Sequence, residues 1–192
     1  MNALLNKIII VAAPSGAGKT SVTRYLLNAM PNDLSFSISA ATRPRRKHET
    51  QGVDYYFITP AEFEDKISKG EFVEWEMVYE GKYYGTLKSE LERIWKAGMT
   101  PLLDVDVVGG VDLQELYPDT SLSLFILPPS IEELRRRLEA RGTETPETLE
   151  ARILKAEHEL SFQDKFDHVI VNDDLTRACK ESEQKVREFL FR

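Results

Sequence analysis

The chain has 192 residues, of which 42% are hydrophobic and 30% charged, and its formal net charge is −7. This size suits one domain with a buried core, and the negative charge argues against a nucleic-acid coat or a membrane-surface protein. The single cysteine, Cys179, excludes a disulfide framework within the chain and favours a reducing compartment, so we expect a cytoplasmic protein. The apolar run after Lys7 is too short for a signal peptide or a spanning helix. With the negative net charge, this makes neither a membrane nor a nucleic acid an expected partner.

Short apolar strands alternate with helical patterns along most of the chain. Ile8–Val11 is β-branched and continuous, which is typical of a buried parallel strand, and a helical pattern follows from Lys19 to Met30. Further strands are predicted at 101–106, 121–127 and 168–171, and further helices at 60–69, at 88–97, from 131, from 146 and at 175–189. This alternation predicts an α/β fold built on a parallel sheet.

The segment from Phe36 to Trp95 differs from the rest, because it is rich in tyrosine, arginine and acidic residues. Thr59, followed by proline and an acidic residue at the third helical position, has the pattern of a helix start. We expect the aromatic side chains of Phe63, Phe72 and Trp75 to form a core in this segment.

The strongest motif follows the first strand. It consists of Ala13, Pro14, Ser15, Gly16, Ala17, Gly18, Lys19 and Thr20, and it matches the P-loop pattern G-x-x-x-x-G-K-[ST] except that alanine takes the first position. The two glycines can aim backbone N–H groups at phosphate oxygens, and the following helix adds its positive dipole end. Lys19 would reach the β- and γ-phosphates, and Thr20 would ligate Mg²⁺. A glycine-rich turn with an exposed lysine is the ordinary alternative, but the flanking strand and helix favour phosphate binding.

Two basic segments could also bind phosphate groups. Arg43, Arg45 and Arg46 lie within four residues and near tyrosines, which suits a phosphate monoester, although a solvated basic loop is equally compatible. Later in the chain, Arg135, Arg136, Arg137 and Arg141 crowd one predicted helix, where a salt-bridged surface is the alternative.

Ordered motifs then run along nearly the whole chain. Besides the loop at 13–20, they are Ser-Ile-Ser-Ala-Ala-Thr-Arg at 37–43, Gly-Val-Asp-Tyr-Tyr-Phe at 52–57, Phe-Val-Glu-Trp at 72–75, Tyr-Tyr-Gly-Thr at 83–86, Leu-Asp-Val-Asp at 103–106, Pro-Pro-Ser at 128–130, Arg-Gly-Thr-Glu-Thr at 141–145 and Val-Asn-Asp-Asp at 171–174. In these motifs the chain resembles the guanylate kinase family. The resemblance implies the P-loop nucleoside monophosphate kinase fold as a single domain over 1–192. Its parallel-sheet core would span 1–35, 96–128 and 161–192, with an inserted GMP-binding subdomain at 36–95 and a lid at 129–160.

The resemblance also implies the activity, which is transfer of the γ-phosphate of ATP to GMP, giving ADP and GDP in purine nucleotide metabolism. Four residues would grip the GMP phosphate, namely Arg43, Arg46, Tyr55 and Tyr84. Four others would read guanine, namely Ser39, Glu74, Thr86 and Asp106. Carboxylates suit that role, because guanine offers N1–H and N2–H₂ donors where adenine has an unprotonated N1. Whether dGMP is accepted as well is left open.

For the donor side, the resemblance places Arg137, Arg141 and Arg152 in a mobile lid over ATP, and it places Asn172 against the adenine. With Lys19 and Arg43 these arginines would be catalytic, because phosphoryl transfer spreads negative charge over the equatorial oxygens. Asp104 would organise Mg²⁺ through its waters, with a purely structural strand end as the alternative. The expected partners are therefore GMP and ATP, with Mg²⁺ and without an obligate protein partner.

The chain departs from the family pattern at Ala13 and at Pro44, which falls one residue early; spacing favours Arg46 over Arg45 for the phosphate contact. Two other functions fit parts of the sequence. A P-loop kinase acting on a ribose phosphate is disfavoured by Glu74 with Asp106. A non-catalytic guanylate-kinase-like interaction module is disfavoured because Lys19, Arg141 and Arg152 are all present.

Overall fold

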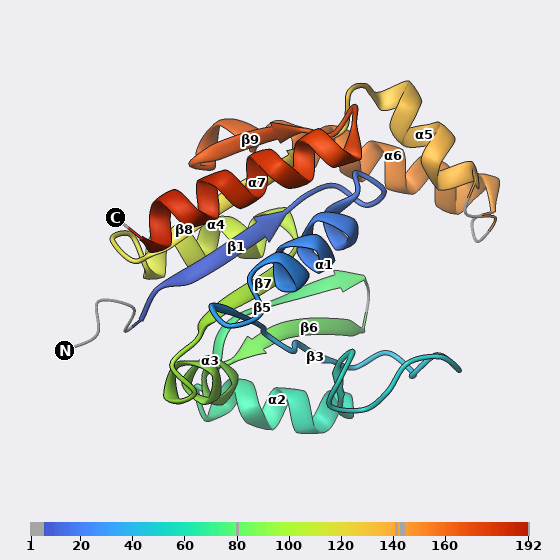
Figure 1. The fold of residues 1–192 in the computed structure, drawn as a ribbon. Helices are drawn as coiled ribbons and strands as arrows, with labels where there is room; N and C mark the ends of the chain where they lie inside the picture. The colour runs from blue at the N-terminus through green and yellow to red at the C-terminus, as the bar shows by residue number, and fades with distance from the viewer. Residues whose placement is uncertain (1–5, 80, 141, 143–144, 192) are drawn as a thin grey trace.

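The computed structural model describes residues 6–79, 81–140, 142 and 145–191, and its centre is a five-stranded sheet (Figure 1). The strands lie in the order β2 (Leu34–Phe36), β7 (Thr100–Val105), β1 (Ile8–Ala12), β8 (Ser121–Leu127) and β9 (His168–Val171). All neighbouring pairs are parallel, which confirms the predicted α/β fold with a parallel sheet.

Helices cover both faces of this sheet, and β1 shows why, since its side chains alternate between them. Ile9 and Val11 pack against α1 (Lys19–Ala29) and α7 (Leu175–Leu190), whereas Ile8 and Ile10 pack with Leu91 of α3 (Lys88–Lys96) and Leu113 of α4 (Val107–Leu116). A strand buried on both faces must be apolar at every position, as this one is. Within the described residues, no helix combines the length and apolarity needed to cross a membrane.

Two further helices, α5 (Ile131–Ala140) and α6 (Pro146–Leu160), pack together beside the sheet (Figure 1). Leu134 and Leu138 of α5 and Ile153 of α6 join the core that α1 and α7 form. A short 3₁₀ turn at Gln163–Lys165 then leads into β9.

A second, four-stranded sheet lies within residues 36–95. Its order is β4 (Tyr56–Phe57), β3 (Ala40–Ala41), β6 (Lys82–Leu87) and β5 (Phe72–Tyr79), and α2 (Pro60–Ser68) packs on it. The expected helix start is confirmed, because Thr59 forms a capping box with Glu62. Phe63 and Phe72 are buried as expected, but the expectation for Trp75 is wrong, since it is 44% exposed. Alternation along β5 turns Trp75 outward when Glu74 points in.

The sequence patterns did not predict α4. Gly109 and Gly110 lie inside it and glycine disfavours helix, but here both positions need a missing side chain. A Cβ on Gly110 would lie 3.1 Å from the Phe166 ring and 3.2 Å from the Ala12 Cβ. Close packing of α4 on the sheet therefore outweighs the low helix propensity.

Phe63 is the anchor of the second sheet, being fully buried and stacked on Phe72 and Tyr83 with ring centroids 4.2 and 5.3 Å apart. We predict that Phe63→Ala lowers the free energy of unfolding by about 3–5 kcal/mol, because the lost ring leaves a cavity. Val53→Ala is the control: Val53 is 61% exposed in the same segment, and its truncation should change stability by less than about 0.5 kcal/mol. Urea titration measures both, and an unchanged midpoint for Phe63→Ala would contradict this role.

Candidate active site

The phosphate loop joins β1 to α1 at the carboxyl edge of the sheet. Gly16 and Gly18 have φ angles of 96° and 103°, which are strained for any residue with a Cβ. Gly18 is the N-cap of α1, and among the described residues no side chain caps that end and no acid lies in its first turn. The first amides of α1 are therefore available to an anion, as the P-loop motif predicts.

Lys19 is held between the loop and the end of β7. Its Nζ lies 2.6 Å from Oδ1 of Asp104 and donates to the main-chain carbonyl of Val105 at 2.5 Å. Desolvation acts to lower the pKa of this ammonium, but the ion pair with Asp104 outweighs it and the net pKa is raised. Lys19 is therefore a permanent positive charge at the junction of β1 and β7.

A cavity of about 350 Å³ opens over the loop, and we refer to it as the donor cavity. Its lining includes Ala13 to Gly16, Gly18 to Ser21, Tyr55, Val78, Asp104, Asp106, Arg152, Lys155 and Glu159. Arg152 of α6 donates from Nη1 to Oγ of Ser15 at 2.8 Å, so this predicted residue does meet the loop. The motifs did not indicate Lys155, which brings a further positive charge to the same wall.

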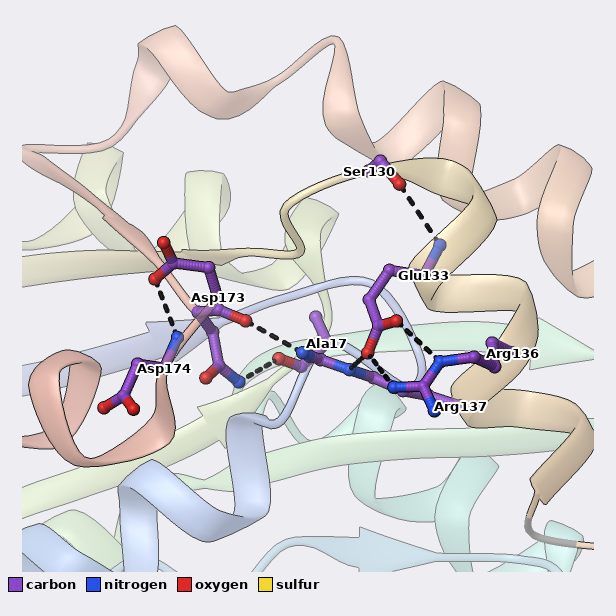
Figure 2. Close-up of polar contacts among 8 residues, drawn as sticks. Ala17, Ser130, Glu133, Arg136, Arg137, Asp173 and Asp174 are labelled. Carbon is purple, nitrogen blue, oxygen red and sulfur yellow. Dashed lines mark hydrogen bonds and ion pairs between the residues drawn. The ribbon is translucent and has the colours of Figure 1, made fainter.

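The other predicted donor-side residues lie at the joint between α5 and the sheet. Figure 2 shows Arg136 and Arg137 converging on the carboxylate of Glu133, with Nε–O distances of 2.7 and 2.8 Å. Arg137 also donates to the main-chain carbonyl of Asn172 at 3.0 Å. The side chain of Asn172 is buried and donates to the carbonyl of Ala17 at 2.7 Å. Arg141 lies outside the described residues.

A second cavity of about 170 Å³ adjoins the first, and we refer to it as the acceptor cavity. It is lined by Lys19, Ser39, Tyr55, Glu74, Glu76, Val78, Tyr84, Gly85, Asp104, Val105 and Asp106. The two cavities share Lys19, Tyr55, Val78, Asp104 and Asp106. Two ligands that occupied both cavities would therefore meet beside Lys19.

Two predicted carboxylates come together at the acceptor cavity. A Cβ on Gly109 would lie 2.9 Å from Oε2 of Glu74 and 3.1 Å from Oδ1 of Asp106, so both acids lie against one residue without a side chain. Asp106 is the N-cap of α4, and its Oδ1 accepts from the Gly109 N–H at 2.8 Å. Its Oδ2 is buried and has no hydrogen-bond partner among the described residues.

Burial raises the pKa of Glu74 to about 7, and the nearby charge of Asp106 acts in the same direction. Thr86 is buried as well and is the register partner of Glu74 on β6. The site thus holds a carboxyl group that changes protonation near neutral pH.

The arginine segment is organised by Glu49. Arg43 makes a bidentate pair with Glu49 at 2.6 and 2.7 Å, which raises the pKa of Arg43 and lowers that of Glu49 to about 2. The Arg43 guanidinium also lies over the Tyr55 ring, 5.0 Å from its centroid. Arg46 donates its main-chain N–H to Glu49, but its side chain is 63% exposed, and neither arginine lines the acceptor cavity.

Sequence reasoning missed four contributors to this site. The motifs gave no role to Gly109, Glu49, Glu76 or Lys155. Gly109 becomes relevant through the distant Glu74, and Glu76 and Lys155 through a shared cavity wall. Glu49 pairs with Arg43 within the same segment, and only the conformation of that segment shows the pairing. The available signal for Glu76 was its position two residues after Glu74 in a strand, which places both side chains on one face.

The phosphate loop lies at the carboxyl edge of a parallel sheet, and a second polar cavity lies beside the loop lysine. This combination defines a P-loop kinase of small molecules. The family model of guanylate kinase matches residues 5–189, and the chain belongs to the guanylate kinase family.

Curated relatives and one solved structure are guanylate kinases similar to this chain over most of its length. The guanylate kinase of Bacteroides fragilis is 52% identical over 184 residues, covering 96% of this chain and 90% of the relative. That of Porphyromonas gingivalis is 48% identical and covers 97% and 99% of the two chains. The crystal structure of guanylate kinase from Anaplasma phagocytophilum superposes with a TM-score of 0.78 at 30% identity, over 100% of this chain and 89% of that one. Shikimate kinase from Bacteroides thetaiotaomicron, at 15% identity and a TM-score of 0.51, shares the fold alone; 97% and 99% of the two chains are covered.

The raised pKa of Glu74 predicts how stability depends on pH without any ligand. A carboxyl whose folded-state pKa lies above its unfolded value stabilises the protein at low pH, and that contribution is lost as the pH rises through about 7. As the pH rises from 5 to 8, the free energy of unfolding of Glu74→Gln should increase by about 2–3 kcal/mol relative to that of the unmodified chain. Urea titrations of both proteins measure the difference, in which titrating groups that do not interact with Glu74 cancel. A difference that does not change with pH would show that Glu74 titrates normally.

Proposed function

We propose that this protein is an ATP:GMP phosphotransferase, which transfers the γ-phosphate of ATP to GMP and releases ADP and GDP. Membership of the guanylate kinase family supports this activity and its place in purine nucleotide metabolism. The observation that carries the choice of acceptor is the buried pair of Glu74 and Asp106 in the cavity beside the phosphate loop.

Guanine recognition follows from what this pair can and cannot do. Ionised carboxylates only accept hydrogen bonds, and the Watson–Crick edge of guanine presents N1–H and N2–H₂ donors to them. Such donors favour the ionised form of Glu74, so guanine binding should lower its raised pKa. The unpartnered Oδ2 of Asp106 is an acceptor with capacity for such a donor. Adenine would instead place its N1 lone pair against a carboxylate. The hydroxyls of Ser39 and Thr86 complete the base site as donors to O6.

The phosphate of GMP lies at the other end of the acceptor cavity, between Tyr55 and Tyr84. Arg43 and Arg46 supply its positive charge, because their segment borders Tyr55. Glu49 holds the Arg43 fork in place, so less side-chain freedom is lost when the phosphate binds. Lys19 is shared by both cavities and bridges the donor and acceptor phosphates.

ATP occupies the donor cavity, with its phosphates over the loop from Ala13 to Thr20. Arg152 already contacts this loop through Ser15, and with Arg137 and Arg141 it neutralises charge in the transition state. Asn172 is proposed to lie near the adenine. The segments 36–95 and 129–160 act as acceptor subdomain and lid.

The donor cavity also suits Mg²⁺. Thr20 and Asp104 both line it and offer oxygen ligands, and Mg²⁺ commonly takes one or two protein oxygens, with phosphates and water supplying the rest. Because Lys19 already engages Asp104, contact through a water is the arrangement we propose for this acid. When bound, the ion neutralises charge on the β- and γ-phosphates; positioning of both substrates is left to the protein. A cytoplasmic location stays a prediction.

Discrimination between guanine and adenine gives a direct test of the roles of Glu74 and Asp106. We predict that the unmodified protein strongly prefers GMP to AMP, and that Glu74→Gln combined with Asp106→Asn lowers kcat/KM for GMP at least tenfold. Each charge-assisted hydrogen bond is worth roughly 1.5–3 kcal/mol, and an amide can also donate to the adenine N1, so discrimination against AMP should weaken.

A coupled ADP-release assay on a panel of nucleoside monophosphates measures both effects. Arg24→Ala, a change on the surface of α1 away from both cavities, is the control and should leave the preference intact. An unchanged GMP/AMP ratio in the double variant would remove the main physical support for guanine recognition by these acids.

A further inference from the structure

Glu76 lines the acceptor cavity together with Glu74, Asp104 and Asp106, but the proposed function gives it no role. It lies two residues after Glu74 on β5, so both side chains project from the same face of the strand. Glu74 is paired in register with Thr86, and Glu76 with Tyr84. Along this strand pair, the proposed base-binding residues Glu74 and Thr86 are followed by Glu76 and the proposed phosphate ligand Tyr84.

This spacing matches the acceptor molecule. Side chains two residues apart on a strand are about 6–7 Å apart, and in a nucleoside monophosphate the sugar separates the base from the phosphate. Tyr84 is opposite Glu76, but its phenol hydroxyl extends well beyond the strand. With the base at Glu74 and the phosphate at that hydroxyl, the sugar lies beside Glu76.

The Glu76 carboxylate has an unused acceptor. Its Oε2 is shielded from solvent and has no hydrogen-bond partner among the described residues. A shielded acceptor without a donor is unfavourable, and a sugar hydroxyl supplies one. A deoxy sugar that lacks the contacting hydroxyl would leave the carboxylate unpaired.

We propose that Glu76 is a specificity-determining residue that accepts a hydrogen bond from one ribose hydroxyl and thereby favours GMP over the deoxy form that lacks this hydroxyl. The assignment rests on the proposed function, since it requires GMP to lie in the acceptor cavity as described above.

The test compares kcat/KM for GMP, 2′-deoxy-GMP and 3′-deoxy-GMP. The unmodified protein should prefer GMP to at least one deoxy form by about tenfold or more, the worth of one charge-assisted hydrogen bond. Glu76→Ala should lower kcat/KM for GMP about tenfold, leave that deoxy substrate unchanged and so remove the preference. Glu76→Gln keeps a neutral acceptor and should fall between. Met77→Ala, on the opposite, exposed face of the same strand, is the matched control.

Unchanged turnover of the deoxy substrate also reports that the variant is folded. Equal preference ratios in the unmodified protein and Glu76→Ala, with both deoxy forms, would overturn the role of Glu76 while leaving GMP kinase activity in place. No turnover of GMP by the unmodified protein would instead overturn the proposed function, and this assignment with it.

An independent observation concerns the support of the phosphate loop. Asn172 follows β9, and its main-chain N–H donates to Leu127 at 2.8 Å, so its position is tied to the sheet. Its amide Nδ2 donates to the carbonyl of Ala17 at 2.7 Å. A Cβ on Gly18 would lie only 2.1 Å from this Nδ2, so the glycine is what allows the contact.

The peptide between Ala17 and Gly18 is planar and trans, so its N–H points opposite to its carbonyl. Holding the carbonyl towards Asn172 directs the Gly18 N–H away from Asn172. The structure assigns Asn172 the role of a positioning residue, one that orients a phosphate-binding amide in addition to any contact with the base of ATP.

Asn172→Ala and the isosteric Asn172→Asp, which has no N–H to donate, test this with two donors that differ in their base, ATP and ITP. A positioning role predicts that kcat/KM falls about tenfold for both donors and that their ratio is unchanged, while KM for GMP is unaffected. Asp173→Asn, an exposed neighbour, is the control.

A loss confined to ATP would assign Asn172 to the base instead, and full activity in a folded variant would overturn any role in the loop. If neither variant folds, Asn172 serves the core rather than the loop, and the proposal fails as well.

Discussion

The site depends on the parallel pairing of β1 with β7. In this register Val11 lies beside Asp104 and Ala12 beside Val105. The phosphate loop therefore begins next to the carboxyl end of β7, where Asp104 lies. Lys19, the first residue of α1, then reaches Asp104 at 2.6 Å. A slip of one residue would turn Asp104 to the opposite face of the sheet and separate the two charges. The strand register, which the apolar core sets, therefore positions Lys19 beside Asp104.

The same edge concentrates negative charge in a protein whose ligands are anions. Glu74, Glu76, Asp104 and Asp106 all line the acceptor cavity, and the net charge of the chain is already −7. Lys19 offsets one of these acids, and burial raises the pKa of Glu74 to about 7. Clustering these carboxylates destabilises the folded protein, and such unfavourable charge clusters are typical of recognition sites.

The loop is not an isolated element, because α5 packs directly on it. A Cβ on Gly16 would lie 3.0 Å from side-chain atoms of both Leu134 and Leu138. Arg137 lies between these leucines in the sequence of α5. It donates to the backbone carbonyl of Asn172, whose side chain in turn holds Ala17. Movement of α5 would therefore act on the loop through packing and through this chain of hydrogen bonds, which couples the proposed lid to phosphate binding.

The sequence by itself determined the alternation of strands and helices, the phosphate loop and, through spaced motifs, the family. These are local patterns: Ile8–Val11 must be buried because it is apolar at every position, and Gly16 and Gly18 meet a local need for positive φ. Only the tertiary structure decided that Glu74 and Asp106 both lie against Gly109, that Glu49 holds Arg43, that α4 forms despite its glycines and that Asn172 supports Ala17. Most of these depend on a contact between residues far apart in the chain or on packing that overrides propensity, and the Arg43–Glu49 pair depends on the conformation of the loop that joins them. No local pattern contains that information, because the distance between two side chains is set by the packing of the elements that carry them.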